Sequence, residues 1–181
     1  MSSSCSSRQA GITLLEILVV VSILGILALL ITQTYPRIYQ AASKAKCISN
    51  MRSVHVALAS YLDEKRIWPQ IPENPEDPFD PRVEEFWIKT LLPYTETEEV
   101  WQCPVLKAAQ ITGPSGNVLR MHYVPTRFDA NPASPRRWSR QPWLVEIADA
   151  HGDGALISFP DGRVQSMGEV FRTLPKTPEP Q

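Results

Sequence analysis

A single carboxylate, Glu16, stands at the start of a long apolar run. No Lys or Arg lies between Arg8 and Arg37, so this segment contains no cationic partner for it. As a helix, the residues from Ile12 to Ile31 would span about 30 Å, the thickness of a bilayer's hydrocarbon core. A carboxylate in that setting costs about 2.5–3.5 kcal/mol on insertion scales. A lone one therefore needs a partner from elsewhere.

Two cysteines, Cys47 and Cys103, follow the apolar run, and a third, Cys5, precedes it. In an oxidising compartment Cys47 and Cys103 could form a disulfide, which would stabilise the fold by about 4 kcal/mol in the chain-entropy model. The alternative is a pair of free thiols, because the sequence does not show that the two sulfur atoms meet. Both interpretations stay open at this point.

The overall charge argues against a nucleic-acid partner. Lys and Arg number 18 against 19 Asp and Glu, a formal net charge of −1, so no global field attracts a polyanion. One local cluster is basic and aromatic, and it could bind an acidic partner, although a solvated loop is the favoured interpretation. Its members are Arg136, Arg137, Trp138, Arg140 and Trp143.

Residues 11–16 (GITLLE), followed by the apolar run, resemble the N-terminal signal of prepilins and type II secretion pseudopilins. The resemblance implies that a prepilin peptidase cuts between Gly11 and Ile12 and that the new N-terminal Ile12 is methylated. It also implies that Glu16, the fifth mature residue, meets the terminal amine of a neighbouring subunit. The family usually has Phe at the first mature position. A generic signal peptide or membrane anchor would not explain Gly11 ahead of the run or Glu16 at this offset.

A second resemblance concerns three short motifs. They are Lys46-Cys47-Ile48-Ser49-Asn50, then Cys103-Pro104, then His151 followed at a fixed spacing by Asp161-Gly162. Together they resemble a pilin-like group abundant in planctomycetes and verrucomicrobia, which has a His-x9-Asp-Gly signature near the C-terminus. That group often has a further His after Asp-Gly, where this chain has Arg163.

Three aspartates near His151 are candidate cation ligands. Major pseudopilins bind a structural Ca²⁺ in the C-terminal head, and oxygen ligands suit this ion, so the resemblance implies calcium at Asp149, Asp153 and Asp161 as one interpretation. The favoured interpretation is turn and hairpin stabilisation, because Asp side chains accept hydrogen bonds from turn amides. No pattern typical of nucleophilic catalysis, zinc binding or phosphate binding stands elsewhere. We therefore expect no enzyme and no cofactor other than this calcium.

One long helix is expected to position Glu16 and Cys47. Apolar residues recur at three- and four-residue steps beyond Pro36, which is the helical period. The stripe consists of Ile38, Ala41, Ala45, Ile48, Met51, Val54, Leu58 and Leu62. The resulting helix of about fifty residues would be about 80 Å long. Its first part would lie in lipid or a filament core, and its second part would pack on a head.

The predicted fold class is α+β, a pilin-like lollipop in which the long helix packs on a small antiparallel sheet. The 17 prolines indicate a loop-rich head. In the head we predict a helix over Val83–Leu92, a buried strand or turn over 100–104, and strands over 117–125 and 143–148. A hairpin is predicted around Pro160-Asp161-Gly162.

These elements divide the chain into five parts. They are a leader (residues 1–11), a transmembrane segment (12–33), its amphipathic continuation (34–64), a head (65–174) and a flexible tail (175–181). The chain is expected to cross the inner membrane once, with its head in the periplasm.

The expected function is a structural subunit of a type II secretion pseudopilus or a type IV pilus-like filament. Its expected partners are other pilin or pseudopilin subunits, the prepilin peptidase, the assembly platform and membrane lipid, with no nucleic acid. The alternative is a minor pilin or membrane-displayed adhesin whose head binds a substrate or surface. The sequence leaves open the machine, the abundance of the subunit and its cargo.

Overall fold

The structure, a computed structural model, describes residues 13–72, 75 and 77–173. Gly11, Ile12 and the predicted tail, residues 175–181, lie outside this part. The chain divides after Gln40 into two compact units, and each is described by itself.

Helix α1 (Leu14–Lys65) has 52 residues, so the expected helix of about fifty residues is confirmed. Thr13 precedes it and accepts hydrogen bonds from the backbone N–H of Glu16 on both its carbonyl (3.1 Å) and its hydroxyl (3.3 Å). These bonds satisfy an amide of the first turn that has no partner within the helix. In the N-terminal unit the large apolar side chains from Leu14 to Ile31 are exposed. By length and composition α1 is able to cross a membrane.

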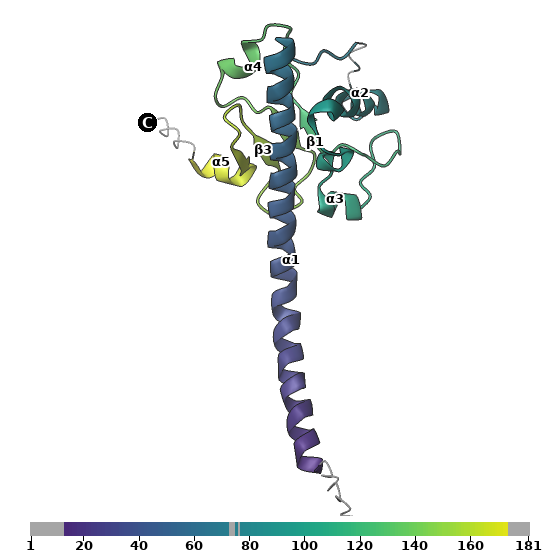
Figure 1. Cartoon of the computed structure of the whole chain (residues 1–181), viewed down its shortest axis with the longest axis vertical. Coiled ribbons are helices and arrows are strands. Elements are labelled where there is room, and N and C mark those ends of the chain that lie inside the picture. The colour runs from purple at the N-terminus through teal and green to yellow at the C-terminus, as the bar shows by residue number, and fades with distance from the viewer. Residues whose placement is uncertain (1–12, 73–74, 76, 174–181) are drawn as a thin grey trace, which may run out of the picture. The chain divides into compact units, whose positions relative to one another are not determined.

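Among the described residues of the second unit, four strands form an antiparallel sheet in the order β1-β2-β3-β4. The strands are β1 (Tyr123–Pro125), β2 (Leu144–Glu146), β3 (Leu156–Ser158) and β4 (Val164–Ser166). The C-terminal part of α1 packs on this sheet, which confirms the α+β class (Figure 1). The predicted hairpin is confirmed as β3–β4, with Gly162 at φ 81° in its turn.

Strand β1 is shorter than predicted. The expected strand over 117–125 is wrong for residues 117–122, of which Val118 forms an isolated bridge to Thr112. The carboxylate of Glu84 in α2 (Pro81–Leu91) accepts the amides of Arg120 and Met121, both at 3.1 Å. A side chain therefore satisfies amides that strand pairing would otherwise use.

The helices of the head are short. The helix predicted over Val83–Leu92 is confirmed as α2, which begins at Pro81 with the Asp80 carboxylate capping the Arg82 amide. The strand predicted as one possibility over 100–104 does not form. Residues 100–101 end η2 (Glu98–Trp101), and residue 104 begins α3 (Pro104–Ala108). The remaining bounds are η1 (Leu92–Tyr94), α4 (Ser134–Arg137) and α5 (Met167–Thr173).

The core of the second unit is rich in tryptophan. Its largest fully buried side chains include Trp68, Trp87, Trp101 and Trp143. His55 of α1 stacks on Trp143 with ring centroids 4.6 Å apart, and its Nδ1 lies 3.1 Å from the Ser158 hydroxyl of β3. These contacts join α1 to the sheet.

The buried face of α1 follows the predicted stripe only in part. Met51, Val54, Leu58 and Leu62 are buried, as predicted. Toward the start of the second unit the prediction is wrong, because Ala41 and Ala45 are exposed whereas Ser43, Cys47 and Asn50 are buried. Apolar periodicity misses this turn because Cys47 and Asn50 meet polar groups of the head.

Candidate functional site

The N-terminal candidate site is Glu16 in the first turn of α1. It is exposed, as are its apolar neighbours Leu15 and Ile17. No Asp, Glu, Lys or Arg occurs between Glu16 and Arg37, so the apolar part of the helix carries this one charge. Gly11 and Ile12, the predicted cleavage residues, lie outside the described residues.

Residues 6–32 match the family model of the prokaryotic N-terminal methylation motif. The match includes Gly11, Ile12 and Glu16 and ends within α1. No curated protein and no solved structure matches the chain. The N-terminal segment is thus a prepilin-type signal, which suggests a type IV pilin-like protein or pseudopilin. Such a signal implies processing by a prepilin peptidase, assembly with pilins and a structural, non-enzymatic family. An apolar helix behind it is consistent with a membrane-anchored pilin.

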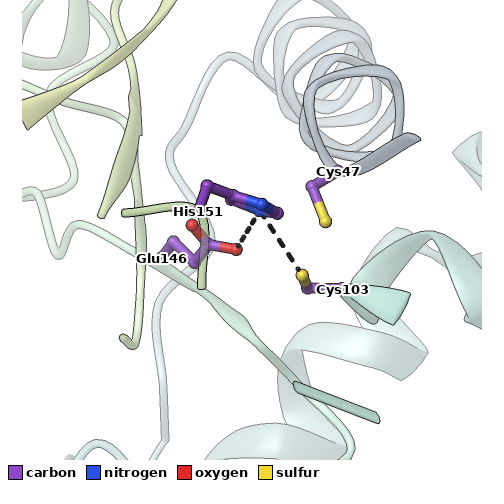
Figure 2. A group of neighbouring side chains, drawn as sticks. All are labelled: Cys47, Cys103, Glu146 and His151. Atoms are coloured by element: carbon purple, nitrogen blue, oxygen red, sulfur yellow. Dashed lines mark hydrogen bonds and ion pairs between the residues drawn. The ribbon is translucent and has the colours of Figure 1, made fainter. Parts of the chain in front are cut away.

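A second candidate site lies inside the head, where four side chains from separate segments converge (Figure 2). Cys47 lies in α1, and Cys103 directly precedes α3. Glu146 ends β2, and His151 lies in the loop between β2 and β3. We call these four residues the Cys-His-Glu cluster. One ligand atom from each lies within 4.8 Å of all the others.

His151 contacts two members of the cluster through one ring nitrogen. Its Nε2 lies 3.7 Å from the Cys103 sulfur and 3.5 Å from Glu146 Oε1. The His151 and Glu146 side chains are 2% and 0% exposed. The cluster is therefore closed to solvent, and its electrostatic interactions are weakly screened.

The backbone around Cys103 holds its thiol in place. The N–H of Cys103 donates to Nδ1 of the buried His122 at 3.0 Å. The contact with the Cys47 thiol lowers the pKa of Cys103, burial opposes this shift, and the backbone amides of Leu106 and Val105 lower the pKa further. The same contact with Cys103, together with burial, raises the pKa of Cys47. The contact between the two thiols therefore shifts their pKa values in opposite directions.

Glu146 has one satisfied and one unsatisfied carboxylate oxygen. Its Oε2 accepts the Leu156 amide of β3 at 3.1 Å, whereas Oε1 makes no hydrogen bond within the described residues. Burial raises the pKa of Glu146 to about 8. The buried Tyr123 hydroxyl also makes no hydrogen bond within that part of the chain, and burial and the nearby Cys47 raise its pKa.

The loop that carries His151 is shaped by Asp149. Asp149 Oδ1 accepts the amides of His151 (3.1 Å) and Gly152 (2.7 Å). Gly154 has φ 80°, and a Cβ there would lie 2.9 Å from the Cβ of Met167. Both features favour a tight turn that directs the His151 side chain into the cluster.

The three aspartates predicted as calcium ligands have protein partners of their own. Asp149 binds the loop amides, and Asp161 accepts the Arg163 amide at 3.0 Å. Asp153 accepts two bonds from Arg172 (2.9 and 3.0 Å) and one from Ser166 (2.6 Å), which lower its pKa to about 2. The one group of metal-compatible side chains among the described residues contains none of these three. Calcium at these positions stays a prediction.

Cys47 and Cys103, the predicted candidates for a disulfide, lie close together as free thiols, and their disulfide stays a prediction. No motif in the sequence pointed to Glu146 or to the convergence of both cysteines with His151. A signal was present, since Cys47, Cys103 and His151 each belong to one of the three motifs of the second resemblance. Their wide separation in the chain hid the relationship.

The basic and aromatic cluster divides between surface and core. Trp143 is buried, and its indole N–H donates to the Pro135 carbonyl at 2.6 Å, so its inclusion in a binding surface is wrong. Trp138 is exposed, and the Arg137 guanidinium lies 5.3 Å from its ring centre. Arg136 pairs with Asp63 of α1 at 2.8 Å. The segment thus anchors to the core and exposes one tryptophan.

Proposed function

We propose that this chain is a structural subunit of a type II secretion pseudopilus or a type IV pilus-like filament. In this proposal the prepilin peptidase cuts between Gly11 and Ile12, and Ile12 becomes the methylated N-terminus. The single observation that supports it best is the methylation-motif match over residues 6–32, which runs into an exposed apolar helix with one carboxylate.

Assembly would work by pairing charges in an apolar environment. In a filament core the α1 helices of neighbouring subunits would cover one another's exposed apolar side chains. An unpaired carboxylate there would be costly, and the Ile12 amine of the adjacent subunit would neutralise Glu16. The pairing would also fix the axial register between subunits, because each helix supplies one positive and one negative group near its start.

The subunit would sit in the inner membrane with its head in the periplasm before assembly, and the assembly platform would extract it into the filament. The motifs around Cys47, Cys103 and His151 support placing it in the planctomycete and verrucomicrobial pilin-like group. No catalytic role is proposed for the head.

The test separates processing from assembly. Wild-type and Glu16→Gln chains are expressed in the native host with the peptidase, and the membrane and sheared-filament fractions are analysed by intact mass and N-terminal sequencing. We expect both chains to begin at Ile12, and we expect intact mass to show N-methylation of the wild type. The Glu16→Gln variant should be absent from filaments. Ser22→Ala in the same apolar segment is the matched control and should assemble normally.

Abundant filaments from Glu16→Gln would contradict the pairing mechanism, and a wild-type chain that still begins at Met1 would contradict the function. Abundance in sheared filaments distinguishes the alternative, a minor pilin or displayed adhesin. A major subunit should dominate the fraction, whereas a minor or tip subunit should be scarce in it. The exposed Trp138 beside Arg137 is the head feature that favours a binding role.

A further inference from the structure

We propose that the Cys-His-Glu cluster is a structural zinc site, in which Cys47, Cys103, Glu146 and His151 supply all four ligands. The proposal concerns the head and does not depend on filament assembly. It is supported by the donor types, the distances between donor atoms and the buried polar atoms that lack partners.

The distances fit tetrahedral zinc. With Zn–S near 2.3 Å and Zn–N and Zn–O near 2.1 Å, tetrahedral geometry places sulfur and nitrogen about 3.6 Å apart, and nitrogen and oxygen about 3.4 Å apart. The observed separations are 3.7 Å from Cys103 Sγ to His151 Nε2 and 3.5 Å from His151 Nε2 to Glu146 Oε1. These two distances differ from the tetrahedral values by about 0.1 Å each, and the Cys47 sulfur lies within 4.8 Å of the other three donor atoms.

A zinc ion would also bind a buried carboxylate oxygen that otherwise lacks a hydrogen bond. Glu146 Oε1 faces the cluster without a hydrogen bond in the described part of the chain, and buried carboxylate oxygens rarely lack a partner. As a ligand it would be satisfied. Zinc binds thiolate and carboxylate, so every proton that Cys47, Cys103 or Glu146 carries would be released to solvent on binding. The Cys47 thiolate would then accept a hydrogen bond from the Tyr123 hydroxyl, a typical outer-shell contact.

A disulfide between Cys47 and Cys103 is the rival use of the same sulfur atoms. It would leave Glu146 Oε1 with only the 3.5 Å contact to His151 Nε2, and it would not account for His151 Nε2 lying 3.7 Å from the Cys103 sulfur. Nitrogen, oxygen and two sulfur donors within 4.8 Å of one another are explained together by a metal and not by a disulfide.

The donor set selects zinc among common ions. Two thiolates exclude Ca²⁺ and Mg²⁺, which prefer oxygen alone, and two cysteines are too few for a typical iron–sulfur cluster. Four protein ligands in a buried site leave no open position for water or substrate, which is typical of structural rather than catalytic zinc. The ion would join α1, the start of α3, the end of β2 and the β2–β3 loop.

A structural ion suits this head. Each of its four strands has three residues, so the sheet contributes few backbone hydrogen bonds. Small domains with short elements commonly rely on a metal or disulfides for stability. A zinc site would explain how a head with such short strands holds its loops in one arrangement.

The test measures metal content and thiol state in the full-length chain. Protein carrying Cys5→Ser, which removes the leader thiol from the count, is purified in detergent without chelator and analysed by elemental mass spectrometry and thiol titration. We expect about one zinc per chain and two thiols that become reactive only after denaturation with chelator. Replacing zinc with Co²⁺ should give the visible absorption typical of tetrahedral cobalt–thiolate coordination.

Variants with matched controls assign the ligands. Cys103→Ser, Glu146→Gln and His151→Gln should each lower zinc retention against a competing chelator by tenfold or more. Glu84→Gln and His55→Gln replace other buried side chains of the same types and should retain zinc like the wild type. Chelation of wild type should lower the midpoint of thermal unfolding by on the order of 10 °C, and added Zn²⁺ should restore it.

Three outcomes would overturn the proposal. The first is a purified chain with a Cys47–Cys103 disulfide and no metal. The second is a reduced, folded chain that binds neither Zn²⁺ nor Co²⁺. The third is equal zinc loss in ligand and control variants. The measurements on the wild-type chain still test the proposal if a ligand variant fails to fold.

Discussion

The side-chain amide of Asn50 donates a 2.9 Å hydrogen bond to the backbone carbonyl of Gln102. Asn50 lies about one helical turn after Cys47, and Gln102 directly precedes Cys103. This bond therefore fixes the distance between the two segments that carry the cysteines, and it replaces an apolar contact at this point of the α1 stripe.

Replacing Asn50 with Leu should destabilise the head by about 1–3 kcal/mol, because it removes the donor to a partly buried carbonyl. The free energy of unfolding is measured by urea titration of the detergent-solubilised chain, followed by tryptophan fluorescence. Ser49→Ala, on the exposed side of the same turn, should change stability by less than about 0.5 kcal/mol. Equal stabilities for the two variants would show that the bond contributes nothing.

His55 should make the head less stable in mild acid. Burial lowers its pKa below the unfolded value of about 6.5, with Arg136 acting in the same direction and Asp161 opposing it. The unfolded state then binds more protons, so stability falls as pH drops from about 6.5 through the lower folded pKa. Its packing neighbours Trp143 and Ser158 carry no charge. His55→Gln should lose less stability than wild type between pH 7 and pH 5.5, and parallel curves would contradict this assignment.

Trp143 and Trp138 should differ sharply when each is replaced by Ala. Trp143 packs against Trp68 with ring centroids 5.2 Å apart and is buried, so its removal should leave a cavity and cost about 3–5 kcal/mol. Trp138 is exposed, and losing its contact with Arg137 should cost about 1 kcal/mol or less. Thermal unfolding of both variants measures the difference. A large loss from Trp138→Ala would mean that its segment supports the fold.

Gly11→Val should block removal of the leader. The resemblance to prepilins places the peptidase's cut directly after Gly11, where a branched side chain would obstruct the scissile bond. Intact mass of the membrane-bound chain should show the leader retained, and filaments should be absent. Ser7→Ala, a change within the same leader, should be processed like wild type. Normal cleavage of Gly11→Val would contradict the assigned cut site.

The sequence by itself determined the features that depend on local pattern. A continuous apolar run followed by a helical period predicted α1, because both signals lie in consecutive residues. Asp161-Gly162 between apolar segments predicted the β3–β4 hairpin, since the turn needs a residue that accepts positive φ. The prepilin-type signal is also local, and its match covers residues 6–32.

Only the tertiary structure decided the features that depend on contacts between distant segments. The backbone amides of Arg120 and Met121 donate to the Glu84 carboxylate. Residues 117–122 therefore form a loop, although their sequence has the two-residue period of a strand. Trp143 is close in sequence to surface arginines. It is nevertheless buried in the core because it directly precedes β2, an inner strand of the sheet. The Cys-His-Glu cluster forms because α1, the start of α3, β2 and the β2–β3 loop meet in the head. Hydrogen bonding and burial of these side chains depend on three-dimensional packing, which the spacing of residues along the chain does not determine.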